Sequence, residues 1–187
     1  MVKLKLLVLL ASFSGLFLSA VKADTYWQIQ HEKLVASDNL YFSWLGCHSC
    51  LMIEQKVDLS GFEQLPLIAR PEWRAAAKIQ MAMQMLSLDE ATVDAFKQEI
   101  IQQKVDVKDL NNMIESLISL GVEQEPLIET LNSRELFSRI QQAQDKAKQY
   151  QVRYVPTAVV KGQYAVDAKS TASVAAFAET LEELKRK

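Results

Sequence analysis

The chain contains few of the residues that crosslink proteins or make sharp turns. Only two of its 187 residues are cysteine, five are glycine and four are proline. Two cysteines exclude a disulfide-rich scaffold, which is dense in cysteine. The sequence has no repeats and no low-complexity segment, and its 49% of hydrophobic residues excludes a wholly disordered chain. The scarcity of glycine indicates short connections between elements.

Basic residues are not in excess either. Lysine and arginine number 21 and aspartate and glutamate 23, so the formal net charge is −2 at pH 7. A nucleic-acid-binding domain usually carries a basic patch or stripe, and the sequence contains no basic stripe. We therefore expect no nucleic-acid partner.

The sequence has one long apolar run, and it lies at the N-terminus. The uncharged run from Leu6 to Val21 follows Lys3 and Lys5. This order is typical of a secretory signal peptide, with cleavage expected after Ala23. An uncleaved anchor is the alternative, but sixteen apolar residues are short for a membrane span, which needs about 20. Residues 1–23 are therefore predicted to be a signal peptide, and the mature chain to be secreted.

Both cysteines, Cys47 and Cys50, lie in one short stretch, FSWLGCHSC. A disulfide persists outside the cytosol, but a bridge across C-x-x-C closes so short a loop that it stabilises a fold weakly. The aromatic residues 39–45 predict a strand before the motif, and residues 51–57 can begin a helix. A C-x-x-C between a strand and a helix is typical of a redox dithiol.

In this arrangement Cys47 lies at the N-terminus of a helix, where unpaired N–H groups and the helix dipole favour its thiolate. We expect Cys47 to be the exposed, attacking sulfur and Cys50 the resolving sulfur. A charged His48 would stabilise the Cys47 thiolate further, and Ser49 could donate a hydrogen bond to the same sulfur. His48 and Ser49 are therefore candidate redox-tuning residues.

The middle of the chain is mainly helical by its pattern. Residues 65–69 are short and apolar, and predict a second core strand that ends before Pro71. Helical periods then follow in four stretches: 72–86, 96–101, 110–118 and 127–150.

The pattern changes again at Val152. The run VRYVPTAVVKGQYAV alternates around Lys161-Gly162, which predicts a hairpin, and a final helix carries apolar residues on one face from Val174 to Leu184. Strands at both ends with helices between predict an α/β fold, in which a helical insertion interrupts one sheet.

Pro156 lies in the strand-like part of this run. A proline cannot donate to a sheet ladder, so it belongs at an edge or at a strand start. A cis bond before Pro156 would leave the backbone of Val155 free to pair with an extended substrate chain. The residues alone favour the trans form, because only about 5–6% of such bonds are cis.

These residues resemble the DsbA family of periplasmic thiol–disulfide oxidoreductases. The likeness runs through the mature chain in order, and it is most specific in FSWLGCHSC and VRYVPTAVVKGQYAV. It implies a thioredoxin-like fold with an inserted α-helical domain. The thioredoxin-like domain is expected to comprise residues 24–71 and 150–187, and the helical insertion residues 72–149.

The resemblance also implies roles for individual residues. Cys47 is the expected nucleophile and Cys50 its resolving partner. The V-P pair matches the family's cis-proline loop, which implies a cis bond before Pro156 and substrate binding by Val155 and Pro156.

The expected activity is disulfide formation in reduced exported proteins in the periplasm. No external cofactor is needed, because the dithiol itself carries the two electrons. By resemblance, a membrane quinone-linked oxidase would restore the disulfide. No dimerisation segment of the kind that an isomerase uses is visible, so we expect a monomeric oxidase. A reductase or isomerase with the same fold is the alternative.

Two features depart from the family pattern. The usual dipeptide between the cysteines is Pro-His, whereas this chain has His48-Ser49. Many relatives also carry a buried acid on the strand before the motif, and the matching position here is Tyr41. The resemblance alone therefore does not establish strong oxidising power, or how the proton of Cys50 is handled.

Metal binding is a competing interpretation. Cys47, Cys50, His48 and His31 could supply the four ligands of a structural zinc site, but no second paired motif is present. The run of Met81, Met83 and Met85 could bind copper(I) through sulfur. Met81 and Met85 share one face of a predicted helix, a spacing that is more typical of core packing. We therefore predict no metal site.

A second alternative is a peptide-binding thioredoxin-like module or chaperone without redox activity. Its apolar surface would include Phe42, Trp44 and Leu45, although the same residues can fill the core beneath the sheet.

Overall fold

A computed structural model describes residues 25–29 and 38–187. The predicted signal peptide and His31 lie outside these residues. Within them, no helix is long and apolar enough to cross a membrane.

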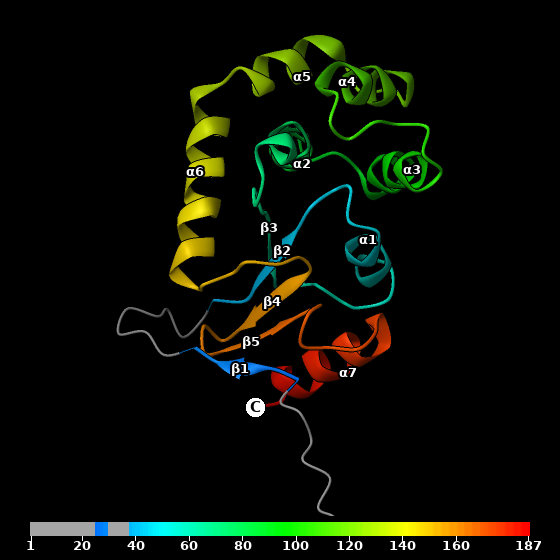
Figure 1. Ribbon diagram of the computed structural model, residues 1–187. Coiled ribbons are helices and arrows are strands. Elements are labelled where there is room, and N and C mark those ends of the chain that lie inside the picture. Colours follow the sequence, from blue (N-terminus) through cyan, green and yellow to red (C-terminus); the bar gives the residue numbers. More distant parts are fainter. Residues whose placement is uncertain (1–24, 30–37) are drawn as a thin grey trace, which may run out of the picture.

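A five-stranded mixed sheet forms the centre of the thioredoxin-like part (Figure 1). Its spatial order is β1-β5-β4-β2-β3. β2 runs parallel to β3 and antiparallel to β4, and β4 and β5 form the predicted hairpin. The strands are β1 (Trp27–Gln28), β2 (Leu40–Ser43), β3 (Glu63–Pro66), β4 (Thr157–Val160) and β5 (Tyr164–Asp167).

Helices cover both faces of this sheet, so its central strands are apolar on both sides, as in other α/β folds. Every residue of β2 and β4 is buried. Phe42 and Val159 share one core cluster with residues of α6 (Arg134–Gln149). Tyr41 and Ala158 share another with residues of α1 (His48–Glu54) and α7 (Val174–Lys185). Figure 1 shows α6 on one side of the sheet and α1 and α7 on the other.

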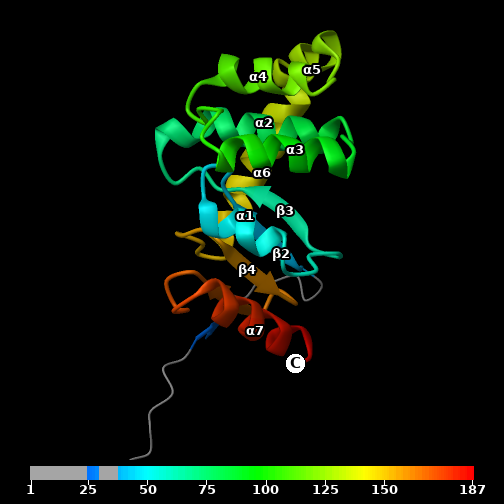
Figure 2. The ribbon, with the colours of Figure 1, turned by 90° about the vertical axis from the view of Figure 1, so that its right-hand side faces the viewer.

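The helical insertion lies between β3 and β4 in the chain, and Figure 2 shows it above the sheet. Its central helix, α2, contacts α4, α5 and α6. The insertion has its own apolar core, which includes Phe96 from α3, Met113 from α4 and Leu127 from α5. The elements are η1 (Pro71–Trp73), α2 (Arg74–Met85), α3 (Glu90–Ile101), α4 (Leu110–Ser119), α5 (Gln124–Leu131) and α6.

Three predicted boundaries were wrong. The second strand is Glu63–Pro66 rather than 65–69, because register with β2 pairs Ser43 with Pro66, and Pro66 is tolerated where it ends an edge strand. The helical stretch 127–150 is two helices, because Ser133 caps a new one by accepting a hydrogen bond from the Leu136 N–H. Residues 152–156 are a loop, since β4 begins only at Thr157.

The methionine run lies within the core of the insertion. Met81 is 3% exposed and Met83 is 5% exposed, and both belong to its apolar cluster, with Met85 packed against it. Met83 lies on a different face of α2 from Met81 and Met85, and it is buried as well because α2 is the central helix and buries more than one face. The packing interpretation of these methionines is confirmed.

Candidate functional site

Three loops leave the same end of the sheet, and the predicted site residues lie on them. Phe42 near the end of β2 pairs with Thr157 at the start of β4, and Thr157 pairs with Asp167 at the end of β5. The loop to Cys47 therefore begins beside the Val155-Pro156 loop, which in turn lies beside the loop after Asp167. The register of the sheet thus brings together residues that are more than a hundred positions apart in the chain.

Cys47 is the N-cap of α1, as predicted. Its sulfur accepts a hydrogen bond from the Cys50 N–H at 3.1 Å, and its carbonyl oxygen accepts one from the Leu51 N–H. Cys47 is half-buried, whereas Cys50 is 0% exposed. The two sulfurs form a disulfide. Only the Cys47 sulfur is therefore placed for attack by a thiolate from solvent, and the amide that it faces stabilises negative charge there.

The two intervening residues lie differently from each other. The Ser49 Oγ is 3.3 Å from the Cys47 Sγ, so its hydroxyl can donate to that sulfur as predicted. His48 is exposed. A positive charge on His48 would therefore act on the Cys47 thiolate through partly solvated space, where charge interactions are weak.

Tyr41 lies beneath the motif, at the position where the family resemblance would place an acid. Its hydroxyl donates a hydrogen bond to the Cys50 carbonyl oxygen at 3.3 Å, and the side chain is completely buried. Burial raises the pKa of the Tyr41 hydroxyl well above its ordinary value, and the nearby Glu54 carboxylate raises it further. Tyr41 therefore stays neutral at physiological pH and anchors the first turn of α1 rather than transferring protons.

The raised pKa of Tyr41 makes stability depend on pH in the alkaline range. Its contribution to the free energy of unfolding is complete below about pH 10, the unfolded value, and is lost as the pH rises towards the higher folded value. We expect Tyr41→Phe to cost about 1 kcal/mol at pH 7, through the lost hydrogen bond, and to flatten the alkaline loss. Urea denaturation at pH 7 to 11 tests this, and parallel pH profiles of the two proteins would contradict it.

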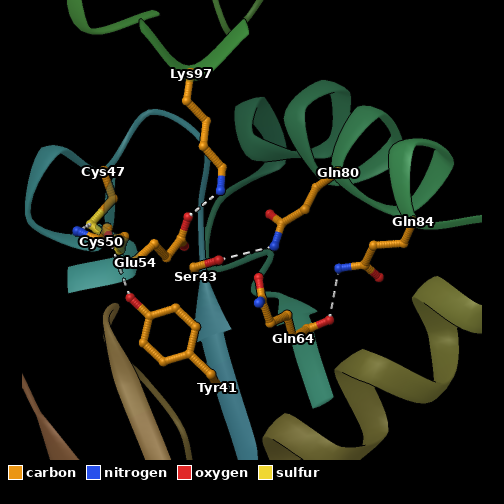
Figure 3. A network of polar contacts seen from close by, with 9 residues as sticks. All are labelled: Tyr41, Ser43, Cys47, Cys50, Glu54, Gln64, Gln80, Gln84 and Lys97. Atoms are coloured by element: carbon orange, nitrogen blue, oxygen red, sulfur yellow. Dashed lines mark hydrogen bonds and ion pairs between the residues drawn. A yellow bond between two sulfur atoms is a disulfide. The ribbon is translucent and has the colours of Figure 1, made fainter. Parts of the chain in front are cut away.

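An ion pair not predicted from the sequence lies behind the motif (Figure 3). Glu54, one helical turn after Cys50, accepts from the Lys97 ammonium at 2.9 Å. The side chains are only 9% and 17% exposed. Glu54 belongs to α1 and Lys97 to α3 of the insertion, so the pair joins the two parts of the molecule. The i, i+4 spacing from Cys50 could have indicated Glu54, but Lys97 is brought close only by the fold.

A cavity of about 330 Å³ opens beside this ion pair, between the sheet and the insertion. The Gln80 side chain is 6% exposed and lines the cavity. Its amide N–H donates to the Ser43 hydroxyl at 2.9 Å, while its carbonyl oxygen has no partner among the described residues. A buried carbonyl of this kind normally binds water, and the cavity has room for water there.

A tryptophan stack supports the loop that leads to Cys47. The Trp44 ring stacks on Trp73 of η1, with centroids 4.4 Å apart and planes 5° from parallel. A Cβ atom at Gly46 would lie 2.4 Å from the Trp44 ring. Gly46 is therefore needed because the indole folds over it. The alternative interpretation had placed Phe42, Trp44 and Leu45 on an apolar surface. Phe42 and Leu45 are buried, and only Trp44 is partly accessible to solvent.

We expect Gly46→Ala to destabilise the fold by about 1–3 kcal/mol, because the indole must leave its stack to make room for a methyl group. Chemical denaturation followed by circular dichroism gives the free energy of unfolding. The same substitution in a Trp44→Leu background should cost much less, since the obstructing ring is gone. An equal cost in both backgrounds would show that the Trp44 contact is not the cause.

The Val155–Pro156 peptide bond is cis. The Pro156 carbonyl accepts from the Ala168 N–H at 3.0 Å, and the Thr157 hydroxyl donates to the Tyr154 carbonyl at 2.7 Å. These bonds tie the loop to its neighbours. Among the described residues, the backbone of half-buried Val155 makes no hydrogen bond, so its N–H and C=O can pair with another chain.

The described part of the chain contains no group of three or more histidine, cysteine, aspartate or glutamate side chains that could hold a metal ion. Cys47 and Cys50 are bonded to each other. The zinc interpretation had also counted His31, which lies outside the described residues.

A model of the DSBA-like thioredoxin domain family matches residues 56–181, more than half of the chain. The chain belongs to this family. The match begins after the two cysteines, so family membership does not rest on them. Thiol:disulfide interchange protein DsbA of Burkholderia cepacia is 24% identical over 149 residues, which cover 75% of this chain and 70% of the relative. The protein of the same name from Pseudomonas syringae pv. tomato is 24% identical and covers 66% and 62%.

Solved DsbA structures share the fold. The Pseudomonas aeruginosa structure superposes with a TM-score of 0.75 at 22% identity, covering 85% of this chain and 88% of that one. A Proteus mirabilis DsbA structure with a bound peptide, PWATCDS, gives a TM-score of 0.68 at 17% identity, covering 87% and 94%. The thioredoxin-like fold with a helical insertion is confirmed. Together with the Cys47–Cys50 pair, the DsbA-like relatives support a thiol:disulfide oxidoreductase function.

Proposed function

We propose that this protein forms disulfides in exported proteins by exchange with its Cys47–Cys50 disulfide. The observation that carries the proposal is the unequal placement of the two sulfurs. Cys47 is accessible and faces the Cys50 N–H, while Cys50 is fully buried behind it. Such a pair directs attack to one sulfur and makes that sulfur a stable leaving group.

The exchange takes two steps. A substrate thiolate attacks the Cys47 sulfur, a substrate–Cys47 bond forms as the Cys47–Cys50 bond breaks, and the released Cys50 thiolate takes up a proton. A second substrate thiolate then attacks the substrate sulfur of this mixed disulfide. The substrate disulfide forms, and Cys47 leaves as a thiolate. Two electrons pass from the substrate to the protein, so no external cofactor takes part.

Substrate binding is assigned to the loop beside Cys47. The unpaired backbone of Val155 supports main-chain pairing with an extended substrate segment, and Pro156 holds the turn that presents it. The peptide held by the Proteus mirabilis relative contains a cysteine, in keeping with this role. His48 and Ser49 are assigned to tuning the Cys47 thiolate, with Ser49 in direct contact.

The cellular setting is part of the proposal. The protein works as a monomer in the periplasm after cleavage of residues 1–23, and a membrane oxidase restores its disulfide. Residues 24–71 and 150–187 form the thioredoxin-like domain, and residues 72–149 form the insertion. The N-terminal apolar run and the family membership support this setting.

The reduction potential of the Cys47–Cys50 pair tests the direction of exchange. The purified mature protein is equilibrated in glutathione buffers, and the reduced fraction is followed by thiol alkylation. A value near −120 mV, about that of DsbA, is expected for an oxidase. A value near −270 mV, about that of thioredoxin, would contradict the oxidase proposal and favour a reductase.

A further inference from the structure

Tyr154 and Lys169 form an exposed pair beside the Val155-Pro156 loop. Tyr154, two residues before Pro156, is 44% exposed and is one of three large apolar side chains that stand out from the described surface. The Lys169 ammonium lies 4.9 Å from the centre of its ring and donates to its hydroxyl at 3.2 Å. The lysine is therefore held in one place by an aromatic ring rather than by a carboxylate.

The sheet places this pair on the substrate-binding side of the molecule. Lys169 follows β5, whose Asp167 pairs with Thr157 at the start of β4. The Ala168 N–H donates to the Pro156 carbonyl, so the residue next to Lys169 is bonded to the cis-proline loop itself. A segment paired with the Val155 backbone would thus pass close to Tyr154 and Lys169.

The surface around Tyr154 and Lys169, which we call the rim, carries positive charge that the described residues do not neutralise. Arg153 and Lys169 are both exposed, and neither forms an ion pair within the described part of the chain. Asp167 is the nearest acid in sequence, but it is buried and accepts from the backbone N–H groups of Lys169 and Ser170. Glu72 is exposed, but it follows β3, whereas Lys169 follows β5. In the strand order these two strands lie on opposite sides of β2, the strand that leads to Cys47.

We propose that Arg153 and Lys169 select substrate segments in which an acidic side chain lies within a few residues of the reacting cysteine. The inference rests on the proposed function and adds a substrate class to it. Tyr154 supplies an apolar surface for the same segment, and the two cations supply charge complementarity. The protein as a whole has a formal net charge of −2, so it would otherwise not attract acidic segments.

The size and salt dependence of the effect follow from its exposed setting. Exposed ion pairs are weak singly and are screened by salt, while complementary charge at a rim mainly speeds association. We therefore expect the acidic preference to appear in the second-order rate of mixed-disulfide formation at low ionic strength, at about threefold to tenfold. It should shrink as salt is added.

The test uses the oxidised, full-length mature protein and three cysteine peptides that differ only in two flanking residues: neutral, acidic or basic. The acidic-to-neutral rate ratio is measured by stopped flow for the wild type, for Lys169→Gln and for Arg153→Gln/Lys169→Gln. Lys169→Arg restores the charge. Lys161→Gln is the matched control, because Lys161 is an exposed lysine in the hairpin turn at the opposite end of the sheet.

The expected result is a wild-type ratio above one that falls towards one in the double variant, returns in Lys169→Arg, and is unchanged in Lys161→Gln. A wild-type ratio of one at low salt, or a ratio that persists in the double variant, overturns the inference. In both of these outcomes the protein still exchanges with the neutral peptide, so they do not contradict the proposed function. No exchange with any peptide would overturn the proposed function and the inference together.

Discussion

A Cys47→Ala variant is expected to lose oxidation of reduced protein substrates by roughly a thousandfold or more, since the more accessible of the two reactive sulfurs is gone. Cys50→Ala should behave differently. It cannot form the internal disulfide, but it keeps the accessible Cys47, whose thiolate attacks a disulfide of an oxidised substrate, releases one substrate thiolate and stays bonded to the other substrate sulfur. Without the Cys50 thiol, nothing within the protein resolves this mixed disulfide, so it should accumulate. Activity is followed by refolding of a reduced disulfide-containing protein, and the adducts by non-reducing electrophoresis and mass spectrometry.

The double variant Cys47→Ala/Cys50→Ala is the control for these adducts, because it has no thiol and should form none. Full oxidase activity in either single variant would overturn the assignment of the dithiol. Adducts that form at Cys50 in Cys47→Ala would show that the buried sulfur is accessible, contrary to its position in the structure.

Lys97→Met is expected to have the largest effect on stability among the charged residues. It leaves the Glu54 carboxylate nearly buried without its cation, and breaking a buried pair in this way costs about 3–5 kcal/mol. We expect roughly 2–4 kcal/mol here, because a small part of each side chain still meets solvent and the neighbouring cavity can admit water. Equilibrium urea denaturation of the oxidised proteins measures the loss.

The double variant Glu54→Gln/Lys97→Met separates charge from packing. It has no unpaired carboxylate, so it should recover most of the lost free energy. Lys78→Met is a matched control on the insertion, because Lys78 contacts the Phe137 ring and forms no ion pair in the described part of the chain. Equal losses in Lys97→Met and the double variant would show that the ion pair contributes little.

The local chemistry of the motif could be predicted from the sequence. The strand before Cys47 is aromatic, and a helix can start directly after it, so the first cysteine had to cap a helix. The hairpin around Lys161-Gly162 and the last helix were also predictable, because alternation and helical periods are properties of adjacent residues. In each case the pattern lies within a few residues of the element that it describes.

Boundaries that depend on partners were not predictable. The second strand was placed at 65–69 from its apolar residues, but pairing with β2 sets it at Glu63–Pro66. The exposed pair of β3 residues, Glu63 and Gln64, carries no apolar signal, and only the register with β2 makes it a strand. The burial of Met83 was not predictable for a related reason, because the sequence does not show that α2 is enclosed on several sides.

The sequence by itself determined the redox dithiol, the C-terminal hairpin, the last helix and the α/β fold class, because each depends on residue types at short spacing. The tertiary structure alone decided that Val155 lies beside the Cys47 loop, that Tyr41 supports Cys50, and that Lys97 neutralises Glu54. The physical reason is that these contacts join distant segments through sheet register and domain packing. Short-range patterns carry no information on which distant side chains will meet.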